Sequence, residues 1–161
     1  MCDYSLMAVP NRLAREGEEL VFHRFPTGSL GLASPADVKR AVSRPPVPQT
    51  FLERLKTFFT PPQTQPVCAV CIPPGATLTL TGIHPRAQRQ FGVSADETVT
   101  FTQITAAVHA YRDAVRFRNG REARLQDLYE GLRVRVIDLS LAEELDLDTL
   151  RRERAEFPVR Y

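Results

Sequence analysis

The sequence contains no tryptophan, and aromatic residues make up only 8% of it. Proteins that bind single-stranded nucleic acid usually stack bases on aromatic side chains that line a basic groove. Here 21 basic residues are balanced by 19 acidic ones, which leaves a formal net charge of +2. The chain lacks both the aromatic platform and the basic excess of such proteins, and we therefore expect no nucleic-acid partner.

The sequence also lacks a long hydrophobic run. A helix needs about 20 mainly apolar residues to span a bilayer, and no stretch of that length is present. Residues 1–11 do not combine a basic start with an apolar run, so no secretory signal is visible. With 43% hydrophobic and 25% charged residues, the composition is that of a globular protein. We therefore expect a cytoplasmic protein with no membrane partner.

Strand patterns are clearest in the second half of the chain. Residues 76–81 and 98–102 alternate threonine with apolar residues, which is the period of a strand with one buried face. We expect Thr79 and Thr100 to point outward. The side chains expected to be buried are Leu78, Leu80, Val99 and Phe101. Further strands are expected before and after the turn at Pro26–Ser29 and over Leu132–Leu139.

An Asn-Gly pair at positions 119–120 predicts a β-hairpin. A two-residue loop would set apolar side chains opposite charged ones. A three-residue loop instead places Val115 opposite Ala123 and Arg116 opposite Glu122, so that both faces of the hairpin match. We therefore predict the three-residue loop.

Several short helices complete the prediction. Helical turns are expected after Ser34-Pro35 and between His84 and Phe91. Between two proline-rich stretches, Phe51–Phe59 places its apolar residues on one helical face. Ser140–Glu156 begins with a capping box, which predicts a C-terminal helix.

We thus predict a mainly β (α+β) fold: a small antiparallel sheet or partly open barrel with peripheral short helices and a C-terminal helix. Residues 1–139 would form a single domain with a proline-flanked helical insertion at about 44–66. Residues 140–161 would pack as a helix and tail on this domain or on a partner. If a protein partner or a second copy of the chain binds, we expect it at Phe51–Phe59 or at the C-terminal helix.

The chain has three cysteines, and this odd number argues against a disulfide framework. Cys68 and Cys71 have the spacing at which a tight turn brings two sulfurs to one metal ion. The prolines at 73–74 prevent a continuing helix, which argues against a thioredoxin-like dithiol. The alternative is a strand whose cysteines act as small hydrophobic core residues, because apolar residues flank the pair.

Cys2 adds a third thiol near the N-terminus. Removal of Met1 would leave a terminal cysteine whose thiol and α-amine could chelate a metal or act as nucleophile and base. The alternative is a chain end without a role. Three cysteine ligands would leave one tetrahedral position open. The candidates for it are His23 and His109, ahead of His84, with Asp3 as a further ligand or as a partner of a ligand.

These residues lead to three functional hypotheses. The first is a mononuclear zinc or iron site built from Cys2, Cys68 and Cys71, with a structural or a catalytic role left open. The second is a metal-free enzyme that uses Cys2 as its nucleophile. The third is an accessory protein that binds a partner through Phe51–Phe59.

Some segments of the chain also suggest relatives. The sequence opens with Met-Cys-Asp-Tyr-Ser-Leu at 1–6 and contains the segments Phe25–Ser29, Cys68–Pro74, Tyr111–Asp113 and Asn119-Gly120. In these segments it resembles a group of short bacterial proteins of unknown function that begin Met-Cys-Asp-Tyr-Ser. The resemblance covers most of the chain. It implies a bacterial source and no particular activity or ligand.

Overall fold

The computed structural model describes residues 6, 8–42, 66–105, 107 and 110–141. These residues form a mixed nine-stranded sheet that curves into a half barrel, together with two short helices. The strands are β1 (Asn11–Leu13), β2 (Glu19–Arg24), β3 (Leu30–Ala33), β4 (Ala69–Cys71), β5 (Thr77–Thr81), β6 (Asp96–Gln103), β7 (Asp113–Phe117), β8 (Glu122–Arg124) and β9 (Arg133–Asp138). The helices are α1 (Pro35–Val42) and α3 (Pro85–Phe91), and a 3₁₀ turn, η2, spans Leu125–Asp127.

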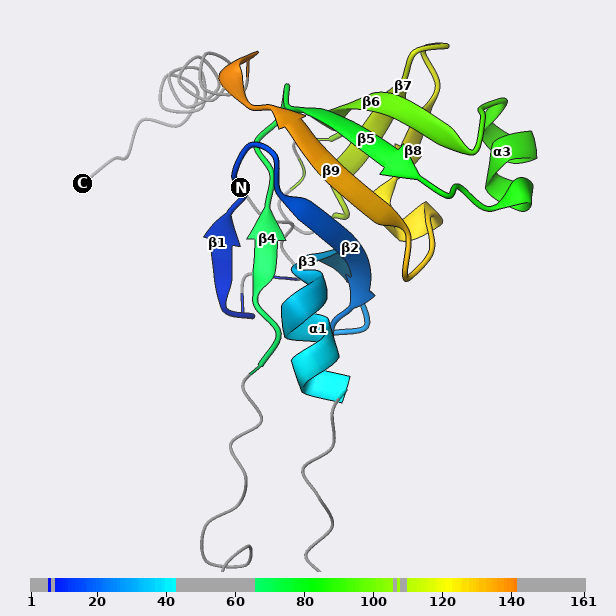
Figure 1. Cartoon of the computed structure of the whole chain (residues 1–161). Helices are drawn as coiled ribbons and strands as arrows, with labels where there is room; N and C mark the ends of the chain where they lie inside the picture. Colours follow the sequence, from blue (N-terminus) through cyan, green and yellow to red (C-terminus); the bar gives the residue numbers. More distant parts are fainter. Residues whose placement is uncertain (1–5, 7, 43–65, 106, 108–109, 142–161) are drawn as a thin grey trace, which may run out of the picture.

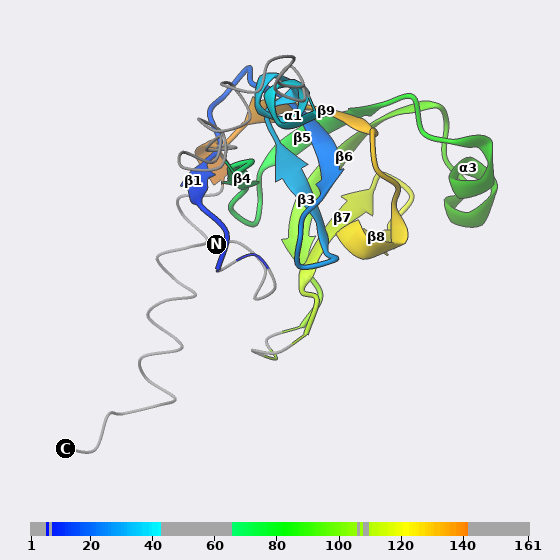
Figure 2. The same cartoon turned by 90° about the horizontal axis from the view of Figure 1, so that it is seen from below.

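The strands follow the order β1-β4-β3-β2-β9-β5-β6-β7-β8 across the sheet. Figure 1 shows α1 beside β2 and β3, and α3 at the opposite end of the molecule, next to the β5–β6 connection. Seen from below in Figure 2, α1 lies on one side of the sheet, away from β7 and β8. No helix among the described residues is long and apolar enough to cross a membrane.

The mainly β prediction is confirmed, and the predicted antiparallel pairing holds except at one edge of the sheet. Every neighbouring pair from β4 to β8 in the sheet order is antiparallel, but β1 pairs with β4 in parallel. A parallel pair needs a long connection, and β2, β3 and α1 all lie between these two strands in the sequence. The sheet is therefore mixed, and it is larger than the small sheet that we predicted.

The main hydrophobic cluster lies on one face of the sheet and includes the side chains that the threonine alternation predicted. Leu78, Leu80, Val99 and Phe101 are each at most 2% exposed. Their threonine neighbours point to the other face, and Thr79 lies opposite Thr98 in the register of β5 and β6. The predicted phase of both strands is confirmed.

The hairpin register is also confirmed. Val115 lies opposite Ala123 and Arg116 opposite Glu122, and the last pair forms a salt bridge of 2.8 Å. Gly120 has a φ of 82° in the loop, a conformation that glycine adopts without strain. The register thus follows from matching side chains on both faces of the hairpin.

A second, smaller cluster lies on the α1 side of the sheet. It consists of Leu6, Phe25, Ala33, Ala69 and Cys71, so it joins residues from four separate stretches of the chain. Gly31 provides the space for it, because a Cβ atom there would lie 2.5 Å from Leu6 Cδ1.

Of the four helices predicted from the sequence, two are present and two fall mainly or wholly on residues that the structure does not describe. The helices after Ser34-Pro35 and His84 are present as α1 and α3. The helix predicted over Ser140–Glu156 falls almost wholly outside the described residues, as does the helix predicted over Phe51–Phe59.

Candidate functional site

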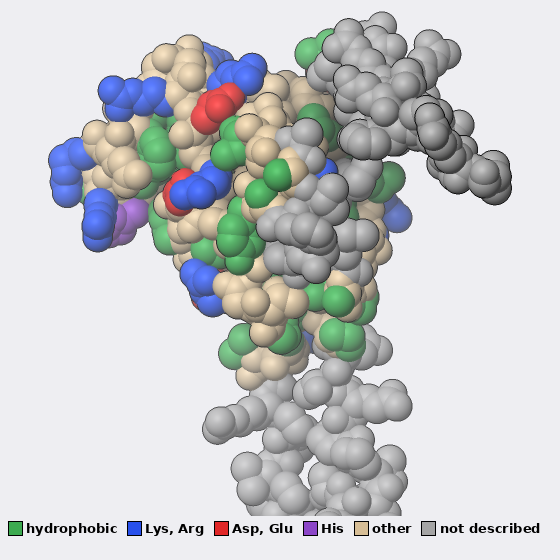
Figure 3. Space-filling model, turned by 180° about the vertical axis from the view of Figure 1, so that it is seen from behind, with side chains coloured by type: hydrophobic (Ala, Val, Ile, Leu, Met, Phe, Trp, Pro, Cys, Tyr) green, Lys and Arg blue, Asp and Glu red, His purple; other side chains and the backbone are tan. Residues whose placement is uncertain are grey.

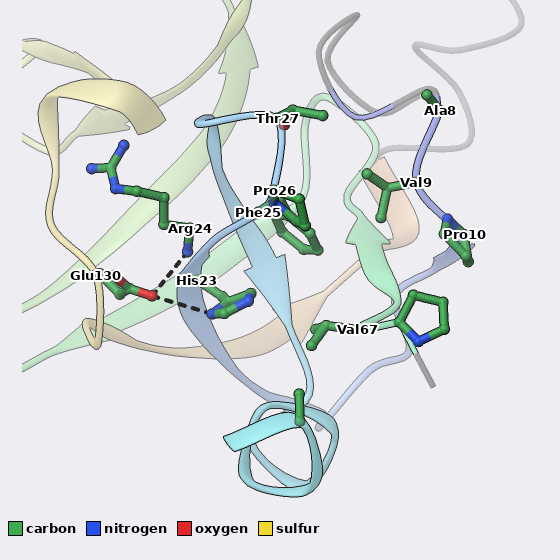
Figure 4. Close-up of a pocket in the computed structure, with 12 residues that line it drawn as sticks. Ala8, Val9, Pro10, His23, Arg24, Phe25, Pro26, Thr27, Val67 and Glu130 are labelled. Carbon is green, nitrogen blue, oxygen red and sulfur yellow. Dashed lines mark hydrogen bonds and ion pairs between the residues drawn. The ribbon is translucent and has the colours of Figure 1, made fainter. Parts of the chain in front are cut away.

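A hollow of about 880 Å³ opens beside the end of β2. Its walls are mainly apolar and come from residues 8–10, from residues 23–27, and from Ala41 and Pro66, which flank the segment 43–65. Besides Arg24, the ionisable side chains in its lining are His23 and Glu130 (Figure 4). We call this cavity the His23 hollow.

His23 and Glu130 lie within salt-bridge distance of each other. His23 Nδ1 lies 3.2 Å from Glu130 Oε1, and the backbone N–H of Arg24 donates to the same oxygen over 3.1 Å. The imidazole packs edge-on against Phe25, with ring centroids 5.1 Å apart. In Figure 4 it lies between Glu130 on one side and Phe25 and Val67 on the other. The contacts with Glu130 and Phe25 therefore fix the orientation of the imidazole ring.

The alternation of β2 explains why His23 faces this hollow. Phe22 belongs to the main cluster, so its neighbour must point to the other face of the sheet. The turn that carries Glu130 is fixed to the same strand, because the Phe22 N–H donates to Leu132 O and the Gly131 N–H donates to Phe22 O. The sequence offers no signal for this pair, because its two members are far apart along the chain.

The pair defines the chemistry that the hollow can offer. An ionised carboxylate attracts an N–H group and repels a nitrogen lone pair, so the tautomer with its hydrogen on Nδ1 is favoured beside Glu130. In the neutral imidazole the other nitrogen, Nε2, is then a hydrogen-bond acceptor and a base. No cysteine, serine or lysine is among the described residues that line the hollow. The described lining is therefore equipped for binding and proton transfer, but it holds no strong nucleophile.

The Cys-x-x-Cys segment does not form the tight turn that we predicted. It runs into β4, and in the strand the side chains alternate: Val70 packs in the main cluster, whereas Cys71 packs in the second cluster. Residues three apart on an extended chain point to opposite faces. Cys68 is half-buried, and its thiol lies 3.6 Å from the Ala69 carbonyl oxygen. The alternative interpretation, a strand with a core cysteine, describes this segment better.

Cys68 and Cys71 also differ in oxidation state. Cys68 is a free cysteine, whereas Cys71 is disulfide-bonded. Because a metal is bound by a thiolate and not by a disulfide sulfur, a site that includes Cys71 would require the reduced protein.

The remaining predicted ligands are not gathered by the described part of the fold. Cys2, Asp3 and His109 lie outside the described residues. His84 caps α3, where its Nδ1 accepts a hydrogen bond of 3.2 Å from the Arg86 N–H. Among the residues that the structure describes, no group of three or more His, Cys, Asp or Glu side chains is placed to hold a metal ion. The metal site stays a prediction.

A partly buried polar contact joins the β2–β3 turn to the segment before β7. Ser29 is only 1% exposed, and its Oγ lies 3.4 Å from the hydroxyl oxygen of Tyr111. The Ser29 carbonyl also accepts the Phe25 N–H, which closes the β2–β3 turn. Segments that are far apart in the sequence thus meet beside the second cluster.

An ion pair fixes the edge strand beside Cys68. The guanidinium of Arg12 on β1 is hydrogen-bonded to the carboxylate of Glu18 through both of its terminal nitrogens. This bond raises the pKa of Arg12 and lowers the pKa of Glu18 below its ordinary range, and the Arg15 N–H adds to the second effect. The pair therefore contributes to stability at neutral pH.

The described residues on the face turned away from α1 expose their hydrophobic side chains in a scattered way. Figure 3 shows hydrophobic side chains there in small separate groups, with basic side chains along one margin. Across the described residues the large exposed hydrophobic side chains lie on different elements, as with Leu13, Tyr111 and Ile137. Scattered apolar side chains of this kind are normal for a protein surface.

The chain matches no protein-family model, no curated protein and no solved structure. A functional assignment therefore depends on the geometry of the site.

Proposed function

We propose that the protein binds a small, mainly apolar molecule that carries a hydroxyl group, and that the His23 hollow is its binding site. The supporting observation is an apolar cavity of about 880 Å³ that contains one oriented histidine–carboxylate pair. Small-molecule sites usually combine about 300–1,000 Å³ of apolar lining with a few placed polar groups. The hollow has this composition.

The orientation of His23 favours a hydrogen-bond donor on the ligand. With the hydrogen of the neutral ring on Nδ1, 3.2 Å from Glu130 Oε1, Nε2 accepts a hydrogen bond rather than donating one. Glu130 and Arg24 offset each other's charge in the lining, so the hollow carries no net charge that would attract an anionic ligand. A phenol or an alcohol satisfies both conditions, and a carboxylate satisfies neither.

The test compares two probes that differ in the hydrogen-bond donor. 2-Naphthol has the required hydroxyl group, and 2-methoxynaphthalene has the same ring without the donor. Because the chain contains no tryptophan, naphthalene emission can be followed without overlap from indole. We expect saturable one-to-one binding, with 2-naphthol binding about tenfold more tightly than 2-methoxynaphthalene, as for one hydrogen bond to a polarised acceptor.

Two histidine variants provide the control. His23→Ala should remove the preference for 2-naphthol and leave the binding of 2-methoxynaphthalene nearly unchanged. His84→Ala removes a histidine that caps α3 and does not line the hollow, so it should preserve the preference. Equal affinity for the two probes in the wild type, or equal effects of the two substitutions, would overturn the proposal.

A further inference from the structure

A second hollow lies on the same side of the sheet, at the opposite end of α1. It has a volume of about 380 Å³, and it is formed by β2, β9 and β5 with Pro35, the first residue of α1, at its rim. Strand β9 is the middle strand of the nine. The floor of this hollow is therefore sheet, which is more rigid than a loop.

Two arginines occupy the centre of this floor. Val134 and Val136 belong to the main cluster, so the alternation of β9 turns Arg133 and Arg135 to the outer face. In the register of the sheet, Arg135 lies between Thr79 and Glu19. Arg133 lies beside Thr81 on β5. Directly opposed residues share one face of a sheet, so both guanidinium groups and both hydroxyl groups belong to one surface.

These polar groups have no partners within the described part of the chain. Arg116 and Arg124 each form an ion pair with a carboxylate, but the guanidinium groups of Arg133 and Arg135 form no ion pair or hydrogen bond with another described residue. Glu19 is the register neighbour of Arg135, yet the two are not within ion-pair distance. Two like charges two residues apart on one strand repel each other, and a bound anion would relieve this repulsion.

We propose that this hollow is an anion site that binds a phosphate group between Arg133 and Arg135, with the hydroxyl groups of Thr79 and Thr81 as additional donors. Guanidinium groups pair with phosphate oxygens through two parallel hydrogen bonds, and threonine hydroxyl groups donate single ones. Glu19 reduces the excess positive charge at one side, so the position between the arginines is the favoured one. The inference is independent of the His23 hollow, because the two cavities have no lining residue in common.

The phosphate group could be free phosphate or part of a larger molecule. Pro35 and Ile137 add apolar surface beside the arginines, and Ile137 is 48% exposed. An organic group attached to the phosphate would cover this surface, whereas inorganic phosphate would leave it open. Inorganic phosphate and phenyl phosphate therefore distinguish the two sources.

The experiment is a titration followed by amide and arginine side-chain NMR signals, with sodium chloride added to hold the ionic strength constant. We expect saturable shifts at Thr79, Thr81, Arg133 and Arg135 with both phosphate probes. Tighter binding of phenyl phosphate would identify a larger ligand, and equal affinity would identify free phosphate. Either result supports the anion site.

Three variants separate a specific site from general charge attraction. Arg135→Gln should weaken phosphate binding about tenfold, as expected for the loss of a charged hydrogen-bonding pair, and Arg133→Lys should weaken it less because the charge remains. Arg118→Gln removes the same charge from the hairpin loop outside the hollow and should have little effect. Shifts of the same size with chloride alone, or equal losses in Arg135→Gln and Arg118→Gln, would overturn the proposal.

Discussion

The two hydrophobic clusters of this protein differ in how the sequence builds them. Most of the main cluster comes from strands and turns between Leu78 and Val136, which follow one another along the chain. The second cluster gathers Leu6, Phe25, Ala69 and Cys71 from separate stretches. Contacts that are local in sequence form with a small loss of chain entropy, whereas distant ones require long loops to close. The main cluster therefore sets the stability of the domain, and the second cluster supports the side that carries both hollows.

The largest expected effect is in the main cluster. Phe101 is 1% exposed, and Phe101→Ala should lower the free energy of unfolding by about 3–5 kcal/mol, because it leaves a cavity in a packed core. Urea denaturation measures this loss. Thr100→Ala on the outer face of the same strand is the control and should change the value by no more than about 0.5 kcal/mol. A loss below about 1 kcal/mol for Phe101→Ala would mean that the main cluster does not dominate the stability of the domain.

The second cluster should respond more weakly, and its response should depend on one pair. A Cβ atom on Gly31 would lie 2.5 Å from Leu6 Cδ1 and 3.0 Å from Phe25 Cε2, so Gly31→Ala should cost about 1–3 kcal/mol by overpacking. Leu6→Ala removes the closest of these contacts. In the double variant, the added cost of Gly31→Ala should largely disappear, which a double-mutant cycle measures. Additive costs would show that Leu6 does not pack against Gly31.

The Arg12–Glu18 ion pair at the edge of the sheet should have a smaller, pH-dependent effect on the free energy of unfolding. Because its hydrogen bond to Arg12 lowers the pKa of Glu18, the ion pair stabilises the fold above the ordinary glutamate pKa of 4.5. This contribution is lost as the pH falls through the lowered pKa of the folded state. Glu18→Gln should therefore cost about 0.5–1 kcal/mol at pH 7, a value reduced for partial exposure. The difference from wild type should vanish in acid, and a constant difference would exclude the ion pair as its cause.

The smallest expected effect concerns Cys68 and also tests the predicted metal site. On the geometry of β4, Cys68→Ser changes a half-buried thiol and should cost less than about 1 kcal/mol. A zinc or iron site would give another result: stoichiometric metal in protein purified under reducing conditions, its loss in Cys68→Ser, and a large drop in stability. Metal analysis by mass spectrometry, measured beside the unfolding curve, distinguishes these results.

The contrast between the clusters also explains what the sequence could predict. The phase of β5 and β6 and the register of the β7–β8 hairpin follow from local alternation and from pairing across a short loop, so both predictions are correct. Strand β1 has only the three residues Asn-Arg-Leu, which carry no alternation, and its partner β4 lies far along the chain. The geometry of Cys68 and Cys71 was predicted as a turn, because spacing alone does not reveal that Ala69 pairs with Asn11 and Ala33.

The candidate sites were predictable only in part. Arg133 and Arg135 alternate visibly with core valines, but the sequence cannot show that Thr79 and Glu19 flank them on neighbouring strands. His23 was named for a metal site, whereas the structure pairs it with Glu130. Such pairs depend on the order of strands in the sheet, and a single sequence contains no local signal for that order.

Ala41 and Pro66 line the same hollow, so the chain leaves and re-enters the described fold at one place. Neither residue belongs to a strand, so a substitution at either would reshape a wall of the His23 hollow without removing a pair from the sheet. Stability and ligand preference can in this way diverge separately during evolution.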